Sequence, residues 1–172
     1  MRNTVAVAVI LAVAALLPTT ARAQQPGSRP TREYLMAAAQ SDQFEILSGT
    51  TALAQTTDPG LRAFATQMIH DHGETSRQRK DTAAREGLAP PPDALGGDQA
   101  QMLNALQSLR GADFDKTYAR QQALAHHSAL TVQQQYAANG DDAALRQLAS
   151  TTTGLISGHL AMAEKMKDAL DR

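Results

Sequence analysis

The feature that most constrains the fold is the segment from Asp141 to Leu170, where apolar residues recur at a heptad-like, helical spacing. The stripe consists of Leu145, Leu148, Thr152, Leu155, Met162 and Met166. His159 lies in the middle of this stripe. A histidine in an apolar seam needs a hydrogen-bond partner, or it is a ligand for something. The segment therefore predicts a long amphipathic helix that carries one polar group at its centre.

Three further segments show the same pattern, at residues 31–55, 59–85 and 113–138. Asp58-Pro59 is typical of a helix start, and Asn139-Gly140 is typical of a helix end. The alternation that marks strands is missing, and Ala, Leu and Gln are abundant. The sequence predicts an all-α fold, an antiparallel four-helix bundle over residues 31–170.

The two halves of this bundle are joined by the one long connection. It contains Ala89-Pro90-Pro91-Pro92 and Gly96-Gly97, and consecutive prolines cannot continue a helix. A short apolar segment follows at residues 99–109. We expect it to be a short extra helix within the crossover.

The N-terminal residues resemble a secretory signal peptide. Arg2 precedes the uncharged apolar run 5–17, and Ala21-Arg22-Ala23 has the form of a cleavage site. We expect a signal peptide at residues 1–23, cleavage after Ala23 and a flexible tether at residues 24–30. The mature protein is then periplasmic or secreted, without stable membrane insertion. An uncleaved anchor is the alternative, although a membrane span needs about 20 apolar residues.

Composition excludes several kinds of function. Without Arg2 and Arg22 the mature chain has 14 basic and 17 acidic residues, so its net charge is −3. No long basic run is present, and nucleic-acid binding has no electrostatic basis. The chain contains no cysteine, which removes thiolate chemistry. No nucleophile motif indicates a hydrolase. The sequence favours a protein without enzyme activity, and an oxidase or peroxide-handling enzyme that uses a single redox metal is the alternative.

One constellation of residues could bind a metal ion. Glu45, His72, His126 and His159 each fall near the middle of a different long helix, on its apolar stripe. In a bundle of helices of similar length these positions meet at one level. Imidazole and carboxylate ligands suit one zinc, iron or copper ion.

Alternatives remain open at this site. The four side chains could instead form a structural polar layer that fixes the register of the helices. His127 is the alternative to His126 as the inward residue, and otherwise we expect His127 and His70 to face solvent. Asp71 precedes His72 by one residue and therefore points about 100° away from it. It could hydrogen-bond to a metal ligand but would not itself bind the ion.

The same residues resemble a known family. Glu45 in an Ala-rich segment, the run Phe64 to His72, Tyr118 eight residues before His126, and His159-Leu160-Ala161-Met162 are similar to the exported bacterial family called domain of unknown function 4142. The resemblance covers about residues 32–167. It implies a ferritin-like bundle, a putative exported or membrane protein, and no settled activity. In the family an Asp commonly precedes the third-helix histidine, where this chain has Ala125.

A ferritin-like fold raises the expectation of a di-iron centre, which uses two Glu-x-x-His pairs. Here Ile69, Ala123 and Ile156 stand three residues before the histidines, so at most one metal ion is expected. The first functional hypothesis is an exported bundle that binds one transition-metal ion. The alternative is a non-catalytic envelope or stress-associated protein that acts through its surface. The sequence identifies no protein partner and leaves a homo-oligomer open.

Overall fold

The computed structural model describes residues 26–172, in which all regular structure is helical. The helices are α1 (Arg29–Gln55), α2 (Pro59–Arg85), α3 (Gly97–Gln107), α4 (Gly111–Asn139) and α5 (Ala143–Leu170). The predicted all-α class is therefore confirmed. The expected signal peptide and its cleavage site lie outside the described residues. Within residues 26–172, no helix is long and apolar enough to cross a membrane.

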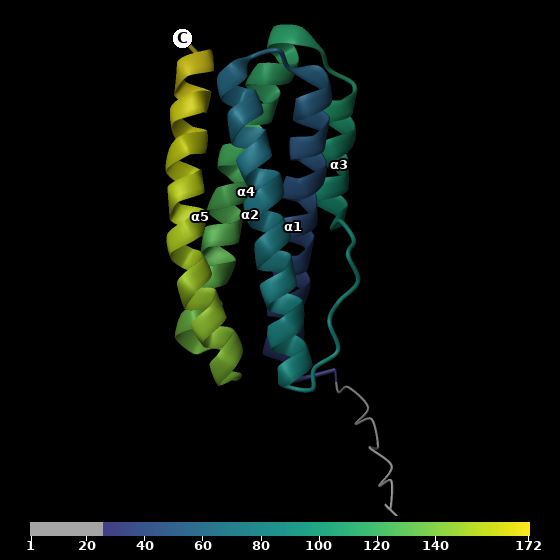
Figure 1. Ribbon diagram of the computed structural model, residues 1–172, viewed down its shortest axis with the longest axis vertical. Helices are drawn as coiled ribbons and strands as arrows, with labels where there is room; N and C mark the ends of the chain where they lie inside the picture. The colour runs from purple at the N-terminus through teal and green to yellow at the C-terminus, as the bar shows by residue number, and fades with distance from the viewer. Residues whose placement is uncertain (1–25) are drawn as a thin grey trace, which may run out of the picture.

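The four long helices form a bundle of two hairpins (Figure 1). In Figure 1, α1 and α5 run upward, whereas α2 and α4 run downward. Helix α1 packs on α2 and α4, and α5 packs on α4 and α2, so each helix has two antiparallel neighbours. The chain after α2 returns along the outside of the bundle, and α3 lies against α1 and α4. The expected short helix is thus present in the crossover.

Polar caps begin three of the long helices. Ser28 Oγ accepts a hydrogen bond from Thr31 N at 3.1 Å, so α1 begins two residues earlier than the sequence indicated. Ser28 is thus the N-cap residue of α1. Asp58 caps α2 and Asp142 caps α5, each through a side-chain oxygen that accepts a backbone N–H.

The inward stripe of α5 is rotated relative to the sequence prediction. Leu145, Thr152 and His159 are buried as expected. Leu148, Leu155, Met162 and Met166 are only partly buried. The buried positions between them are Ala149, Ile156, Leu160 and Ala163. Small alanines face the core because neighbouring helices approach closely there, and the larger residues flank the seam.

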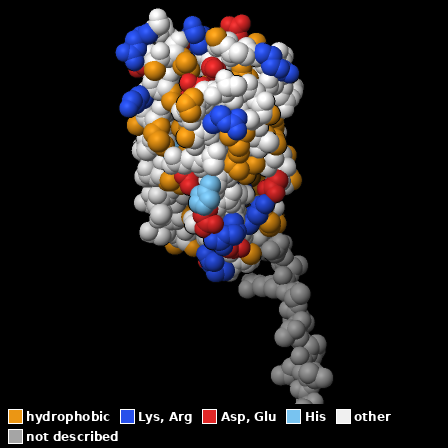
Figure 2. All heavy atoms as spheres, turned by 45° about the horizontal axis from the view of Figure 1, so that its top comes forward, with side chains coloured by type: hydrophobic (Ala, Val, Ile, Leu, Met, Phe, Trp, Pro, Cys, Tyr) orange, Lys and Arg blue, Asp and Glu red, His pale blue; other side chains and the backbone are white. Residues whose placement is uncertain are grey.

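Two apolar clusters fill the two ends of the bundle. One is built around Phe64, Phe114 and Tyr118, and the other around Leu35 and Leu145. The middle of each long helix contributes buried polar residues instead. The surface is mixed: Figure 2 shows acidic, basic and hydrophobic side chains interspersed on one face.

Candidate metal centre

Three histidines from three helices meet in the middle of the bundle. His72 comes from α2, His126 from α4 and His159 from α5, and each is at most 1% exposed. Their ring centroids are 5.5–5.6 Å apart. One ring nitrogen of each lies within 4.8 Å of those of the other two. The sequence prediction placed these three residues at one level, and the structure brings them together.

Each imidazole is held from behind by an oxygen acceptor. His72 Nδ1 lies 3.1 Å from Asp42 Oδ1, and His159 Nε2 lies 2.9 Å from Asp71 Oδ2. His126 Nδ1 lies 2.8 Å from the carbonyl oxygen of Gln122, one turn earlier in α4. A carbonyl or an ionised carboxylate can only accept, so these ring nitrogens donate. This pattern is the one that orients metal-binding histidines.

The opposite nitrogens of the three rings have no hydrogen-bond partner among residues 26–172. These atoms are His72 Nε2, His126 Nε2 and His159 Nδ1, and all are buried. Buried polar atoms of this kind are uncommon, because each one left unpaired costs about 1–3 kcal/mol. A tetrahedral ion bound at 2.0–2.1 Å holds two nitrogens about 3.3 Å apart. Nitrogens that are as much as 4.8 Å apart would therefore have to move inward on binding.

Glu45 lies beside the three histidines but outside their group. It is 1% exposed, and its Oε1 is 3.8 Å from His126 Nδ1, the nitrogen that faces away from the centre. Its Oε2 has no partner. Burial raises the pKa of Glu45 to about 7, against the opposing effects of His72 and Gln122. Its assignment as a fourth ligand stays a prediction.

The electrostatic surroundings differ between the histidines. Burial, together with the charge of His72, lowers the pKa of His126 to about 3. Burial and the charge of His72 also lower the pKa of His159. Burial lowers the pKa of His72 as well, but the hydrogen bond to Asp42 and the nearby carboxylates outweigh it, so the net shift is upward. The centre thus favours a single positive charge over several.

Asp42 and Arg79 belong to the site, although sequence reasoning did not assign them to it. Asp42 Oδ1 accepts from Thr75 at 2.8 Å as well as from His72, and Arg79 approaches Oδ2 at 3.4 Å. Both side chains are buried. The signal for Asp42 was present, because it lies on the inward stripe of α1 one turn before Glu45. Arg79 lies seven residues after His72 and hence on the same side of α2.

The remaining histidines lie outside the core. The structure buries His126 and exposes His127, so the expected register of this helix holds. His127 contacts Glu164 at 3.0 Å on the surface. His70 is also exposed, and its Nδ1 lies 2.9 Å from Asp71 Oδ1. Asp71 thus contacts one exposed and one buried histidine, and its contact behind the ring of His159 agrees with the outer role that the sequence indicated.

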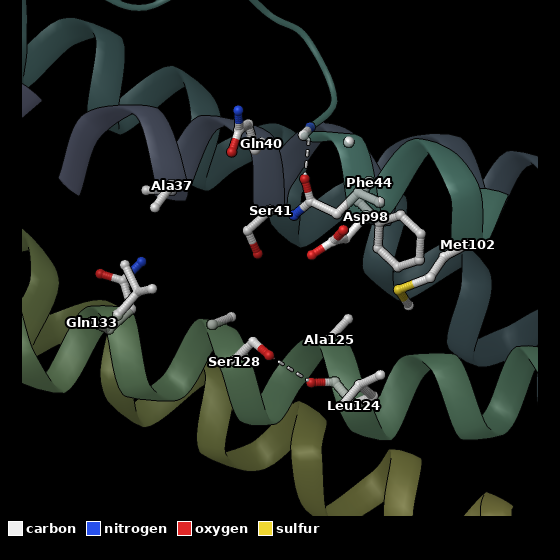
Figure 3. A pocket seen from close by; sticks show the side chains of 16 residues that line it. Ala37, Gln40, Ser41, Phe44, Asp98, Met102, Leu124, Ala125, Ser128 and Gln133 are labelled. Atoms are coloured by element: carbon white, nitrogen blue, oxygen red, sulfur yellow. Dashed lines mark hydrogen bonds between the residues drawn. The ribbon is translucent and has the colours of Figure 1, made fainter. Parts of the chain in front are cut away.

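A separate hollow of about 670 Å³ lies between α1, α3 and α4. Figure 3 shows its walls, with Ser41 and Phe44 on one side, Met102 at one end, and Ala125 and Ser128 opposite. None of the three core histidines lines it. The hollow and the candidate metal centre are therefore distinct.

Comparison with known proteins agrees with the fold. No curated protein matches the chain. The structure is similar to a crystal structure of a DUF305 fragment from Deinococcus radiodurans, with a TM-score of 0.70 and 15% sequence identity over 86% of this chain and 99% of that one. At this identity the likeness concerns the fold alone. The family model described as "Domain of unknown function (DUF4142)" matches residues 16–166. Since this match spans most of the sequence, the chain belongs to that family.

Proposed function

We propose that this protein binds one transition-metal ion at the middle of the bundle, through His72, His126 and His159. The observation that supports this most is the orientation of the rings. Each ring donates a hydrogen bond through one nitrogen and has its other nitrogen buried without a partner among the described residues, and one ring nitrogen of each lies within 4.8 Å of those of the other two. Neutral imidazoles suit zinc, copper and iron.

Glu45 completes the proposed site on the side of α1. Its buried Oε2, which has no partner among the described residues, supplies the fourth, anionic ligand in this proposal. A water molecule in that position would instead leave Glu45 as its hydrogen-bond acceptor. In both arrangements the carboxylates of Asp42, Asp71 and Glu45 surround a dication with compensating charge.

The wider setting that we propose is an exported, ferritin-like protein that binds or senses metal in the periplasm. The signal-like N-terminal sequence supports export. The single long crossover is also the connection found in ferritin-like bundles. The apolar residues at Ile69, Ala123 and Ile156 favour one ion over a di-iron pair.

The test is elemental analysis of untagged protein purified from its native compartment, beside His126→Ala and Glu45→Ala. His127→Ala is the matched control, because it removes an exposed histidine next to the buried one. We expect about one equivalent of metal in the wild type and the control, and loss in His126→Ala. Retention in Glu45→Ala would assign the fourth position to water.

Absence of metal from wild-type protein under zinc, iron and copper supplementation would refute the metal site. The polar layer would then be structural, and a surface role in the cell envelope would become the better hypothesis.

A further inference from the structure

A metal ion that reaches this centre needs a route, because all three histidines are buried. Among the described residues, Asp71 connects the centre with solvent. Its carboxylate is 19% exposed, and Oδ2 accepts from buried His159 at 2.9 Å. Its other oxygen, Oδ1, accepts from His70, whose side chain is 79% exposed. Hydrogen bonds thus connect exposed His70, partly buried Asp71 and buried His159 in a line from solvent to the core.

The seam between α2 and α5 is hollow at this point. A cavity of about 190 Å³ opens there, lined by Asp71 and Thr75 from α2 and by Thr151 and Thr152 from α5. Helices α2 and α5 also contact each other much less than the pairs within either hairpin. Thr75 in turn donates to Asp42, the carboxylate behind His72. The cavity therefore borders the groups that hold two of the three core histidines.

Asp71 is the carboxylate of this cavity that is directed to the core. Glu74, which also lines it, is engaged on the surface by Arg77 at 2.6 Å and by Gln78 at 2.8 Å. The carboxylate of Asp71 thus contacts both exposed His70 and buried His159.

We propose that the α2–α5 seam is the entry route for the metal ion, with His70 and Asp71 as a first binding site for a divalent cation. The ion first contacts Asp71 and the His70 imidazole. It then passes inward through the cavity of the seam to His159 and the other two core histidines. This inference rests on the proposed metal centre and adds the path by which it is loaded.

The chain offers a matched control on another face. His127 and Glu164 form an exposed histidine–carboxylate pair at 3.0 Å, and His127 also neighbours a core histidine in sequence. Glu164, however, has no hydrogen bond to any of the three core histidines. A cation captured by this pair has no connected route inward, so its removal should leave loading unchanged.

The experiment mixes metal-free protein rapidly with Co²⁺, whose visible absorption reports coordination in the core. We expect His70→Ala to slow uptake about threefold or more at unchanged final occupancy, and Asp71→Asn to slow it about tenfold. Asp71→Asn should also weaken binding, because it frees the His159 ring. His127→Ala should match the wild type in rate and in occupancy.

A second pair of variants tests the α2–α5 seam without changing His70 or Asp71. Thr151→Tyr places a ring at the cavity, whereas Thr131→Tyr changes an exposed threonine of α4 that has the same hydrogen bond to a carbonyl four residues earlier. We expect slower uptake in Thr151→Tyr alone. Wild-type uptake rates in His70→Ala, Asp71→Asn and Thr151→Tyr at full occupancy would overturn the route and leave the metal site standing. Failure of wild-type protein to bind Co²⁺, Zn²⁺ or Cu²⁺ at equilibrium would refute the metal site itself.

Discussion

Asp42 and Arg79 form a buried ion pair behind His72, and its disruption should be among the costliest single changes in the polar layer. Asp42→Asn keeps the shape of the side chain but removes the negative charge that faces Arg79. The Arg79 side chain is only 3% exposed, and its Nη1 already lacks a partner. Removing one member of a buried pair costs about 3–5 kcal/mol because the other charge remains buried. We therefore expect Asp42→Asn to lower the free energy of unfolding by about 3 kcal/mol.

The opposite change should cost less. In Arg79→Met the carboxylate of Asp42 keeps two donors, Thr75 at 2.8 Å and His72 at 3.1 Å. Loss of one of several hydrogen bonds to a charged group costs about 1.5–3 kcal/mol, and the methionine recovers part of this through packing. The double variant Asp42→Asn/Arg79→Met should then be more stable than Asp42→Asn alone, because no unpaired charge is left.

The measurement is urea unfolding followed by circular dichroism, in buffer with chelator so that metal binding does not contribute. Glu33→Gln is the control, because it breaks an exposed pair with Arg29 and should leave the midpoint within error. A loss below about 1 kcal/mol in Asp42→Asn would refute the reasoning. So would a double variant whose loss equals the sum of the two single losses, since the two charges would then be independent.

Further predictions concern backbone packing, pH and metal. A Cβ at Gly49 would lie 3.0 Å from the carbonyl oxygen of Ala65, so Gly49→Ala should destabilise by about 1 kcal/mol. Nothing lies within 4 Å of a Cβ at Gly154, so Gly154→Ala should stabilise the fold by about 0.5–1 kcal/mol. Equal changes in the free energy of unfolding for Gly49→Ala and Gly154→Ala, measured by urea unfolding, would contradict these two predictions. The pKa of His126 is about 3 in the folded protein and ordinary when unfolded, so its contribution to stability is lost as pH falls from about 6.5 toward 3, by up to about 1.4 kcal/mol per unit. The raised pKa of Glu45 has the opposite effect, because its contribution to stability increases as pH falls from about 7 to 4.5. The contribution of His126 is therefore measured as the difference between wild type and His126→Asn in how the free energy of unfolding depends on pH. Zinc at 100 times its Kd should raise the free energy of unfolding by about 2.7 kcal/mol, which thermal melting with and without chelator can check.

Local sequence rules predicted most of the fold. Helices begin or end at or near the residues that the sequence marked as breaks, which are Asp58-Pro59, the triple proline after Ala89, and Gly140. The rotation of the α5 stripe was not predictable in this way. Leu148 and Leu155 are more hydrophobic than Ala149, but the narrow space between close-packed helices accepts the alanine, and only the packed structure defines that space.

The candidate site was predictable where it depends on the length and phase of single helices. His72, His126 and His159 meet because each lies midway along an inward stripe. The contacts behind the rings depend on rotamers and on relative rotation of helices, which one sequence does not encode locally. Asp71 illustrates this. Helix geometry fixes the direction of its side chain relative to that of His72 on α2, whereas its hydrogen bond to His159 depends on the position of α5.

The cost of the polar layer argues that it exists for more than stability. Three histidine nitrogens and Glu45 Oε2 are buried without a partner in the described part of the chain, and each such atom costs about 1–3 kcal/mol. Apolar side chains of similar volume would fill the same layer with a more stable result. A cation bound between the rings would use the three nitrogens together, and the carboxylates around them would balance its charge. Binding and folding should therefore be linked: chelation would lower stability in the wild type, and an apolar replacement of all three histidines would raise the stability of the metal-free protein while abolishing the effect of the chelator.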